Sequence, residues 1–125
     1  MSLKNSYFIL CRPQLGENIG SSARALKNFS IPNLRIVNPR CSWPNQKAKA
    51  TSVGAINILK SAKIFTSVEK SVGDLDIVFA STSRPRKVNK KIISITEFTK
   101  KIKKNKKIGI IFGPEASGLS NNEVN

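Results

Sequence analysis

One arginine near the start of the chain has the chemistry to hold a phosphate. Arg24 follows Gly20 by four residues, so helical spacing places both on one face together with Ser21 and Asn28. A guanidinium is planar and permanently charged, and its fork of donors suits phosphate oxygens. The small residues Gly20 and Ser21 leave room beside it for a substrate. An ordinary solvated arginine on a surface helix is the alternative.

A second segment with candidate chemistry is a glycine turn after an apolar run, at residues 108–119. Gly113 and Gly118 stand in this turn, and small polar residues at 81–83 end an earlier apolar run. Glycine lets the backbone approach a ligand closely, and exposed amides bind its polar atoms. Neither glycine turn matches G-x-G-x-x-G or a complete phosphate-binding loop. The segments favour a cofactor-binding enzyme that has neither of the common sites for dinucleotides or nucleoside triphosphates. The alternative is that both are ordinary strand-to-helix turns.

The elements that must position these residues alternate between strand and helix. Apolar runs predict strands at residues 7–11, 34–37, 63–66, 76–80 and 107–112. Helical spacing predicts helices at residues 19–29, 48–60, 68–72 and 95–104. This alternation predicts an α/β fold with a mostly parallel sheet flanked by helices. Ligands of such sheets bind beyond the carboxyl ends of the strands, where both glycine turns stand.

The charge of the chain is strongly one-sided. Lys and Arg number 22 against 7 Asp and Glu, for a formal net charge of +15. Half of this positive charge stands between Arg84 and Lys107, beside the single acid Glu97. Such an excess indicates a polyanionic partner, most simply nucleic acid, and the run resembles a footprint for a phosphate backbone. A solvated, lysine-rich face is the alternative.

Several classes of site and location are disfavoured. Histidine is absent, which excludes a histidine general base, a Ser-His-Asp triad and a His-ligated metal. Cys11 and Cys41 have no metal-like spacing, and Cys11 lies in an apolar run as a buried thiol. Residues 1–6 lack the pattern of a signal peptide, and no apolar run approaches the ~20 residues of a membrane span. We expect no metal, no membrane and a reducing, cytoplasmic location.

Two motifs occur in a fixed order. The first is Asn18-x-Gly20-x-x-x-Arg24-x-x-x-Asn28-Phe29, followed by Leu34-x-Ile36-Val37-Asn38-Pro39, and the second is Ile111-Phe112-Gly113-Pro114-Glu115-x-x-Gly118-Leu119. Together they resemble the SpoU/TrmH branch of the SPOUT RNA 2′-O-ribose methyltransferases. Residues 12–18 and Trp43-Pro44-Asn45 most resemble the bacterial TrmJ-type tRNA methyltransferases. The resemblance extends over nearly the whole chain from about Ser6.

The resemblance implies a fold, a cofactor and a set of site residues. It implies an α/β fold with a deep trefoil knot, S-adenosylmethionine as cofactor, and a homodimer with active sites at its interface. The reaction implied is 2′-O-methylation of RNA, most simply of tRNA at position 32 in the anticodon loop. By this likeness Arg24, Asn18 and Glu115 are catalytic. The cofactor set is Ser81, Thr82, Ser83, Gly113, Gly118 and Leu119, and the RNA set is Arg12, Arg84, Arg86 and Lys87.

The third motif of the family, of Ser-Leu-Asn-Leu type, does not occur within residues 1–125. Ser120 and Glu123 have the spacing of a capping box, which predicts the start of a helix. Only Val124 and Asn125 follow, and a single turn is not a stable helix. We expect residues 1–125 to be a single SPOUT methyltransferase domain, incomplete at its C-terminus and without the knot-forming part. Two other functions stay open: a non-catalytic RNA-binding remnant, and a small-ligand-binding domain with an incidental basic surface.

Overall fold

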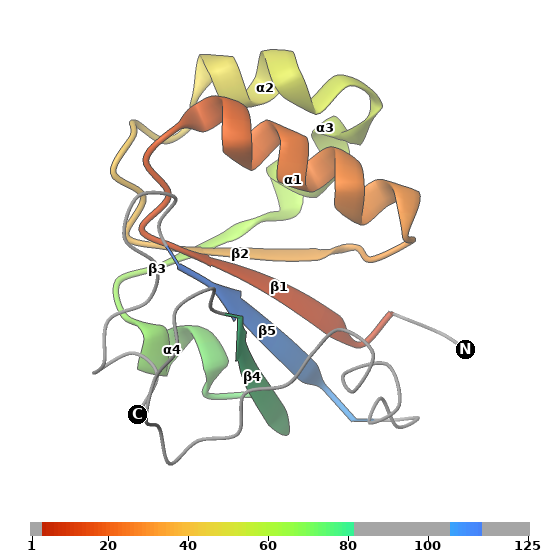
Figure 1. Cartoon of the computed structure of the whole chain (residues 1–125), viewed down its shortest axis with the longest axis vertical. Helices are drawn as coiled ribbons and strands as arrows, with labels where there is room; N and C mark the ends of the chain where they lie inside the picture. The colour runs from red at the N-terminus through yellow and green to blue at the C-terminus, as the bar shows by residue number, and fades with distance from the viewer. Residues whose placement is uncertain (1–3, 82–105, 114–125) are drawn as a thin grey trace.

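A parallel five-stranded sheet forms the centre of the chain in a computed structural model that describes residues 4–81 and 106–113 (Figure 1). The strands are β1 (Ser6–Cys11), β2 (Asn33–Val37), β3 (Lys63–Phe65), β4 (Ile77–Ser81) and β5 (Ile108–Phe112). Their order is β3-β2-β1-β5-β4, and all four neighbouring pairs are parallel. The predicted α/β class and parallel sheet are confirmed, because each expected strand forms close to its expected bounds.

Helices cover both faces of the sheet. Three of them, α1 (Gly16–Asn28), α2 (Gln46–Ser52) and α3 (Ile56–Ser61), lie on one face, and α4 (Val68–Val72) lies on the other (Figure 1). The helix predicted at residues 68–72 is confirmed. α1 begins at Gly16, earlier than expected, because the carbonyl of Leu15 already accepts hydrogen bonds from the N–H groups of Asn18 and Ile19. The helix predicted at residues 95–104 lies outside the described residues.

The single helix predicted over residues 48–60 is wrong, because the chain breaks it in the middle. α2 ends at Ser52, and a 3-10 turn, η1 (Val53–Ala55), separates it from α3. Val53 has a φ of 44°, a conformation that a β-branched residue rarely adopts. The Thr51 hydroxyl donates to the carbonyl of Lys47, a local bond that bends helices. The break therefore falls on the weak helix formers that the sequence already contains there.

β1 divides its side chains between two cores, since successive residues of a strand point to opposite faces. Ile9 and Cys11 are buried on the α4 side together with Val37 and Ile111. The expected burial of the Cys11 thiol is confirmed, with 1% of the residue exposed. Phe8 and Leu10 of the same strand pack against the core on the α1 side.

The apolar stripe of α1 is narrow. Ile19, Ala23 and Leu26 are buried against the sheet, as their spacing predicts. Ala25 and Phe29, which lie beside this stripe, are exposed, and Phe29 is 68% exposed. The helix turns by about 100° per residue, which places both positions to one side of the stripe.

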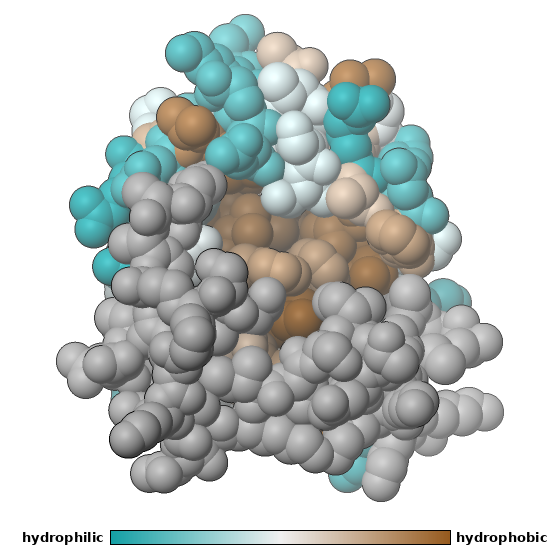
Figure 2. All heavy atoms as spheres, viewed as in Figure 1, coloured by the Kyte–Doolittle hydropathy of each residue, from teal (hydrophilic) through white to brown (hydrophobic). Residues whose placement is uncertain are grey.

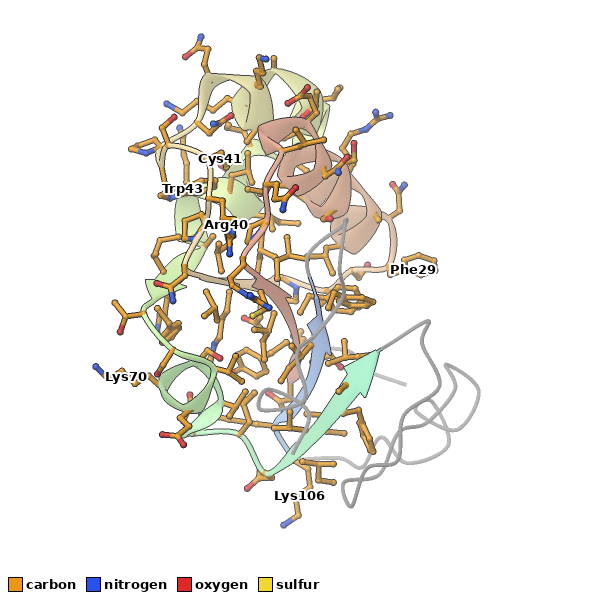
Figure 3. The ribbon with its side chains drawn as sticks, turned by 60° about the vertical axis from the view of Figure 1, so that its left-hand side comes forward. Phe29, Arg40, Cys41, Trp43, Lys70 and Lys106 are labelled. Atoms are coloured by element: carbon orange, nitrogen blue, oxygen red, sulfur yellow. The ribbon has the colours of Figure 1, made fainter. Side chains whose placement is uncertain are left out.

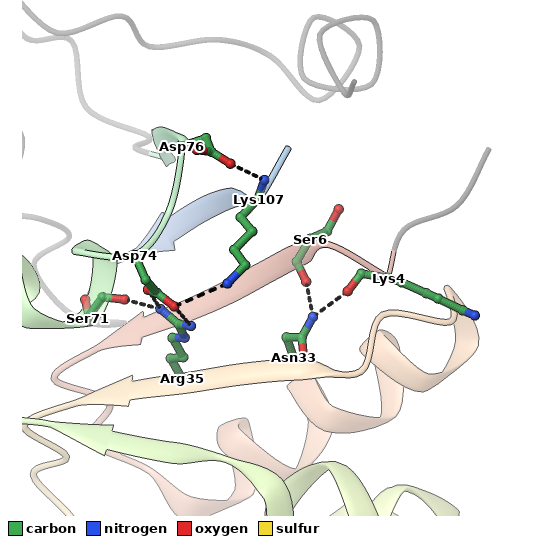
Figure 4. A network of polar contacts seen from close by, with 8 residues as sticks. All are labelled: Lys4, Ser6, Asn33, Arg35, Ser71, Asp74, Asp76 and Lys107. Carbon is green, nitrogen blue, oxygen red and sulfur yellow. Dashed lines mark hydrogen bonds and ion pairs between the residues drawn. The ribbon is translucent and has the colours of Figure 1, made fainter. Parts of the chain in front are cut away.

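β2 carries a buried cation whose partners come from the α4 side of the sheet. Arg35 Nη1 donates to the carbonyl of Ser71 at 2.6 Å and to Asp74 Oδ1 at 2.7 Å, and Nη2 donates to Asp74 Oδ2 at 2.9 Å (Figure 4). The ring centroids of Tyr7 and Phe65 lie 4.4 and 5.5 Å from the Arg35 Cζ. These contacts satisfy the guanidinium and join α4 to the centre of the sheet.

The paired carboxylate makes stability depend on pH. Hydrogen bonds from Arg35 lower the pKa of Asp74 from 3.8 to about 2. The stabilisation from the pair is therefore complete above about pH 4 and is lost as the pH falls through about 2. We expect the free energy of unfolding of the wild-type protein to fall more steeply across this window than that of Asp74→Asn. Urea titrations along a pH series measure the difference, which is modest because the Asp74 side chain is 52% exposed. Parallel pH profiles would contradict the prediction.

Candidate active site

The carboxyl ends of the strands meet at one edge of the sheet, since all the strands are parallel. Ser81 ends β4 and pairs with Phe112, which ends β5. Gly113 follows directly, so it leaves the sheet beside the end of β4. The structure thus brings together Ser81 and Gly113, two positions predicted to contact one cofactor. Eight of the predicted site residues lie outside the described residues: Thr82, Ser83, Arg84, Arg86, Lys87, Glu115, Gly118 and Leu119.

A cleft of about 440 Å³ opens at this edge, between α1 and the sheet. Its volume lies within the range of about 300–1,000 Å³ that is typical of small-molecule sites. Figure 2 shows apolar atoms gathered in a hollow below α1. Phe8 and Phe112 form part of this apolar wall, with their ring centroids 5.1 Å apart. The polar side of the cleft comes from α1, through Asn18, Ser21 and Ser22.

The first predicted motif contributes to this cleft through three positions of one helix face. Asn18, Ser22 and Ala25 line it, and the Ser22 hydroxyl donates to the Asn18 carbonyl at 2.8 Å. The structure therefore brings Asn18 and Gly113, one from each motif, to the same cleft. Ser22 and Ala25 were not among the predicted site residues. Their spacing from Asn18, at i+4 and i+7, was the available signal.

Gly20 has a different role from the expected one. A side chain there would collide with the Thr51 hydroxyl, and its Cβ would lie 2.5 Å from the carbonyl oxygen of Ala48 and 3.0 Å from the N–H nitrogen of Ser52. The residue is buried where α1 crosses α2. The expectation that Gly20 leaves room for a substrate is wrong, because its lack of a side chain is used for close helix packing.

Arg24 lies one turn beyond Gly20 and is exposed. The cleft residues of α1 are Asn18, Ile19, Ser21, Ser22 and Ala25, and Arg24 is not one of them. At about 100° per residue, Arg24 lies about 120° round the helix from Asn18 and about 160° from Ser22. Its side chain is therefore exposed and does not line the cleft of its own chain.

The predicted RNA contact Arg12 lies at the same edge of the sheet, directly after β1. It has a φ of 51°, and its N–H donates to the carbonyl of Val37 at 2.7 Å. Asn38 follows β2 with a φ of 44°, and its N–H donates to the carbonyl of Phe65 at 2.9 Å. These left-handed residues turn the chain away from the sheet at the point where each strand ends. Backbone hydrogen bonds therefore fix the first residue after β1 and the first residue after β2 at this edge.

Across residues 4–81 and 106–113, no three His, Cys, Asp or Glu side chains form a group that could hold a metal ion. Over the same ranges, every helix falls short of the length and apolar character needed to cross a membrane.

Comparison with known proteins gives consistent matches. The profile of the SpoU rRNA Methylase family matches residues 5–125. The tRNA (cytidine-2′-O-)-methyltransferase TrmJ of Methanocaldococcus jannaschii is 40% identical over 120 residues, which are 93% of this chain and 52% of that protein. An uncharacterized tRNA/rRNA methyltransferase of Haemophilus influenzae is 34% identical over 123 residues, 98% of this chain and 50% of that protein. The crystal structure of TrmJ from Z. mobilis ZM4 superposes with a TM-score of 0.89 at 42% identity, over 95% of this chain and 54% of that one. The chain spans about half the length of the curated relatives it matches.

Proposed function

Since the chain belongs to the SpoU rRNA Methylase family, we propose that it methylates ribose 2′-hydroxyls of tRNA with S-adenosylmethionine as the methyl donor. The resemblance of its motifs to this family is thereby confirmed. One observation carries the proposal furthest. Asn18 of the first motif and Gly113 of the second are distant in sequence, yet both line the cleft at the carboxyl edge of the sheet. Enzymes on open α/β sheets bind their ligands at this edge.

The residues of the cleft fit a nucleoside-type cofactor. Phe8, Leu10 and Phe112 offer an apolar wall for a ring, and the hydroxyls and amide on α1 offer polar partners. When bound, S-adenosylmethionine supplies an electrophilic methyl group. We propose that Gly113 and Ser81 contact it from the neighbouring ends of β5 and β4. Thr82, Ser83, Gly118 and Leu119 complete the proposed contact set.

The task left to the protein is to orient the ribose 2′-hydroxyl and to stabilise negative charge on its oxygen. Orientation alone can contribute about 7–11 kcal/mol to lowering a barrier. The chain has no histidine to accept the proton, and an arginine stays protonated in proteins. We therefore propose that Arg24 holds the phosphate and the hydroxyl and stabilises the developing alkoxide. The proton then passes to phosphate or solvent, while Asn18 and Glu115 shape the site.

A homodimer accounts for the position of Arg24. The side chain is exposed and lies outside the cleft of its own chain. In a two-fold dimer, one surface of a subunit meets the same surface of its partner, so an outward arginine can reach the partner's cleft. We propose that each active site is formed at such an interface and takes its Arg24 from the opposite subunit.

Charge and relationship support tRNA as the substrate. The net charge of +15, with its run from Arg84 to Lys107, matches a polyanionic partner. The curated TrmJ relatives are named as tRNA 2′-O-methyltransferases. We propose the anticodon loop, at position 32, as the target, with Arg12, Arg84, Arg86 and Lys87 on the RNA. A cytoplasmic location, where tRNA is modified, stays a prediction.

Methyl transfer tests the proposal directly. We expect the full-length protein that contains this domain to transfer label from [methyl-³H]S-adenosylmethionine to a tRNA transcript, because the cleft and the basic surface serve one reaction. Nuclease mapping should place the label on a single ribose of the anticodon loop. The matched control is the same transcript with a 2′-deoxyribose at that nucleotide, which should accept no label. RNA binding without any methyl transfer would instead favour the non-catalytic RNA-binding alternative.

A further inference from the structure

A second, smaller crevice lies between the loop that follows β2 and the helices α2 and α3. It encloses about 220 Å³, and its lining includes Trp43, Asn45, Lys49 and Lys60. Trp43, the single tryptophan of the chain, is half-buried and packs against the core on the α1 side. Asn45 Oδ1 accepts a hydrogen bond from the N–H of Ala48 at 3.0 Å, which fixes the loop to the start of α2. The crevice is therefore a built feature with an aromatic wall.

The stretch of chain that forms this crevice carries cations without acids. Between Asn18 and Val68 the chain has no Asp or Glu. The buried Arg35 of this stretch is engaged by Asp74. The other cations of the stretch are all exposed: Arg24, Lys27, Arg40, Lys47, Lys49, Lys60 and Lys63. The resulting positive field is separate in sequence from the run at Arg84 to Lys107, and it favours a polyanionic ligand.

The crevice lies close to the edge that carries the candidate active site. Its loop leaves the sheet at the carboxyl end of β2, and Figure 3 shows Arg40, Cys41 and Trp43 together on this loop. In the sheet order, β2 is two strands from β5. Two strand spacings amount to about 10 Å. The loop therefore starts within the reach of one or two nucleotides from the end of β5.

We infer that this crevice binds one unpaired nucleotide of the RNA substrate, with its base against the Trp43 indole and its phosphates at Lys49 and Lys60. Every base has a flat face that stacks on an aromatic ring, and lysines neutralise the adjoining phosphates. An unpaired loop nucleotide fits better than a duplex, because its base is free to turn out of the stack. The inference rests on the proposed RNA substrate and adds a second contact site to it.

The single tryptophan gives a direct readout. A labelled single-stranded oligoribonucleotide is titrated into the protein at low salt, and its anisotropy and the Trp43 emission are followed together. We expect Trp43 emission to be quenched with the same dissociation constant that anisotropy reports. Trp43→Leu should weaken binding by about ten-fold, the scale of one lost base stack.

A matched pair of double variants separates this crevice from general charge. Lys49→Gln/Lys60→Gln removes two cations of the crevice, and Lys4→Gln/Lys70→Gln removes two exposed cations that do not line it (Lys70 in Figure 3, Lys4 in Figure 4). The first should reduce the slope of log affinity against log salt by about 1.4, at about 0.7 for each phosphate contact in single strands. The second should leave the slope and the quenching close to those of the wild-type protein.

The outcomes distinguish failure of the nucleotide-binding crevice from failure of the proposed RNA substrate. Binding by anisotropy with unchanged Trp43 emission and equal effects of both double variants would overturn the crevice and leave the RNA substrate standing. Equal quenching by poly-glutamate would overturn the nucleotide as the occupant in favour of an acidic peptide. An absence of oligoribonucleotide binding at low salt would overturn the proposed RNA substrate together with this inference.

Discussion

In the full-length protein, we expect Arg24→Ala to lower methyl transfer to tRNA by at least about 10²–10³-fold, the scale of losing one group that stabilises a transition-state oxyanion. The affinity for S-adenosylmethionine should stay close to that of the wild-type protein, because the proposed ligands of Arg24 are the RNA phosphate and the ribose hydroxyl and not the cofactor. Single-turnover kinetics with labelled cofactor measure the first quantity, and calorimetric titration measures the second. Near-normal turnover would remove Arg24 from the mechanism.

Two companion variants sharpen this test. Arg24→Lys keeps the charge but loses the planar fork of donors, so it should restore little activity. Lys27→Ala removes another exposed cation from the same helix, three residues further on. It should keep most of the turnover if Arg24 acts through its position and not through the general field of α1. A loss as large as that of Arg24→Ala would assign the effect to charge alone.

Mixed dimers test where Arg24 acts. We combine Arg24→Ala subunits with subunits that carry Gly113→Val, a change aimed at the cleft. In a heterodimer, one site then has an intact cleft from the first subunit and an intact Arg24 from the second. Recovery of activity on mixing two inactive variants would support action across the interface, and continued inactivity would place Arg24 in the site of its own subunit.

Much of the fold follows from local patterns in the sequence. The runs at residues 7–11 and 108–112 are apolar on both faces, which is typical of parallel strands covered on both sides, and both form central strands. Arg35 shows the limit of this reasoning, because a lone arginine in a strand reads as a surface residue. Its burial depends on Asp74, Ser71 and two aromatic rings that come together only in the folded sheet.

The site was predictable in part for the same reason. Strand ends were identifiable, so Ser81 and Gly113 could be placed at one edge before the structure was known. Helical spacing could not tell which face of α1 meets the sheet, which meets α2 and which borders the cleft. Gly20 and Arg24 share a face by spacing, yet one is buried under α2 and the other is exposed. That division is set by the packing of a second helix, whose position no local pattern specifies.

The role of Gly20 in packing leads to the largest effect on stability that we expect. Gly20→Ala adds a methyl group that would collide with the Thr51 hydroxyl and lie 2.5 Å from the Ala48 carbonyl oxygen. A helix gains about 1 kcal/mol when glycine becomes alanine, but forcing two packed helices apart costs more. We expect a net loss of about 2 kcal/mol in the free energy of unfolding. Urea denaturation followed by circular dichroism measures it.

Gly73→Ala is the matched control for this prediction, because the same chemical change meets only ordinary van der Waals contacts there. Its Cβ would lie 3.6 Å from the nearest atom, the Glu69 carbonyl oxygen, and the backbone is already helical, with φ −60° and ψ −28°. Gly73→Ala should therefore be neutral or stabilise by about 0.4–1 kcal/mol. Adding Thr51→Ala to Gly20→Ala should restore little stability, since the clash with the Ala48 backbone remains. If Gly20→Ala proved as stable as Gly73→Ala, the close contact of α1 with α2 would be wrong, and with it the placement of Asn18 on the cleft.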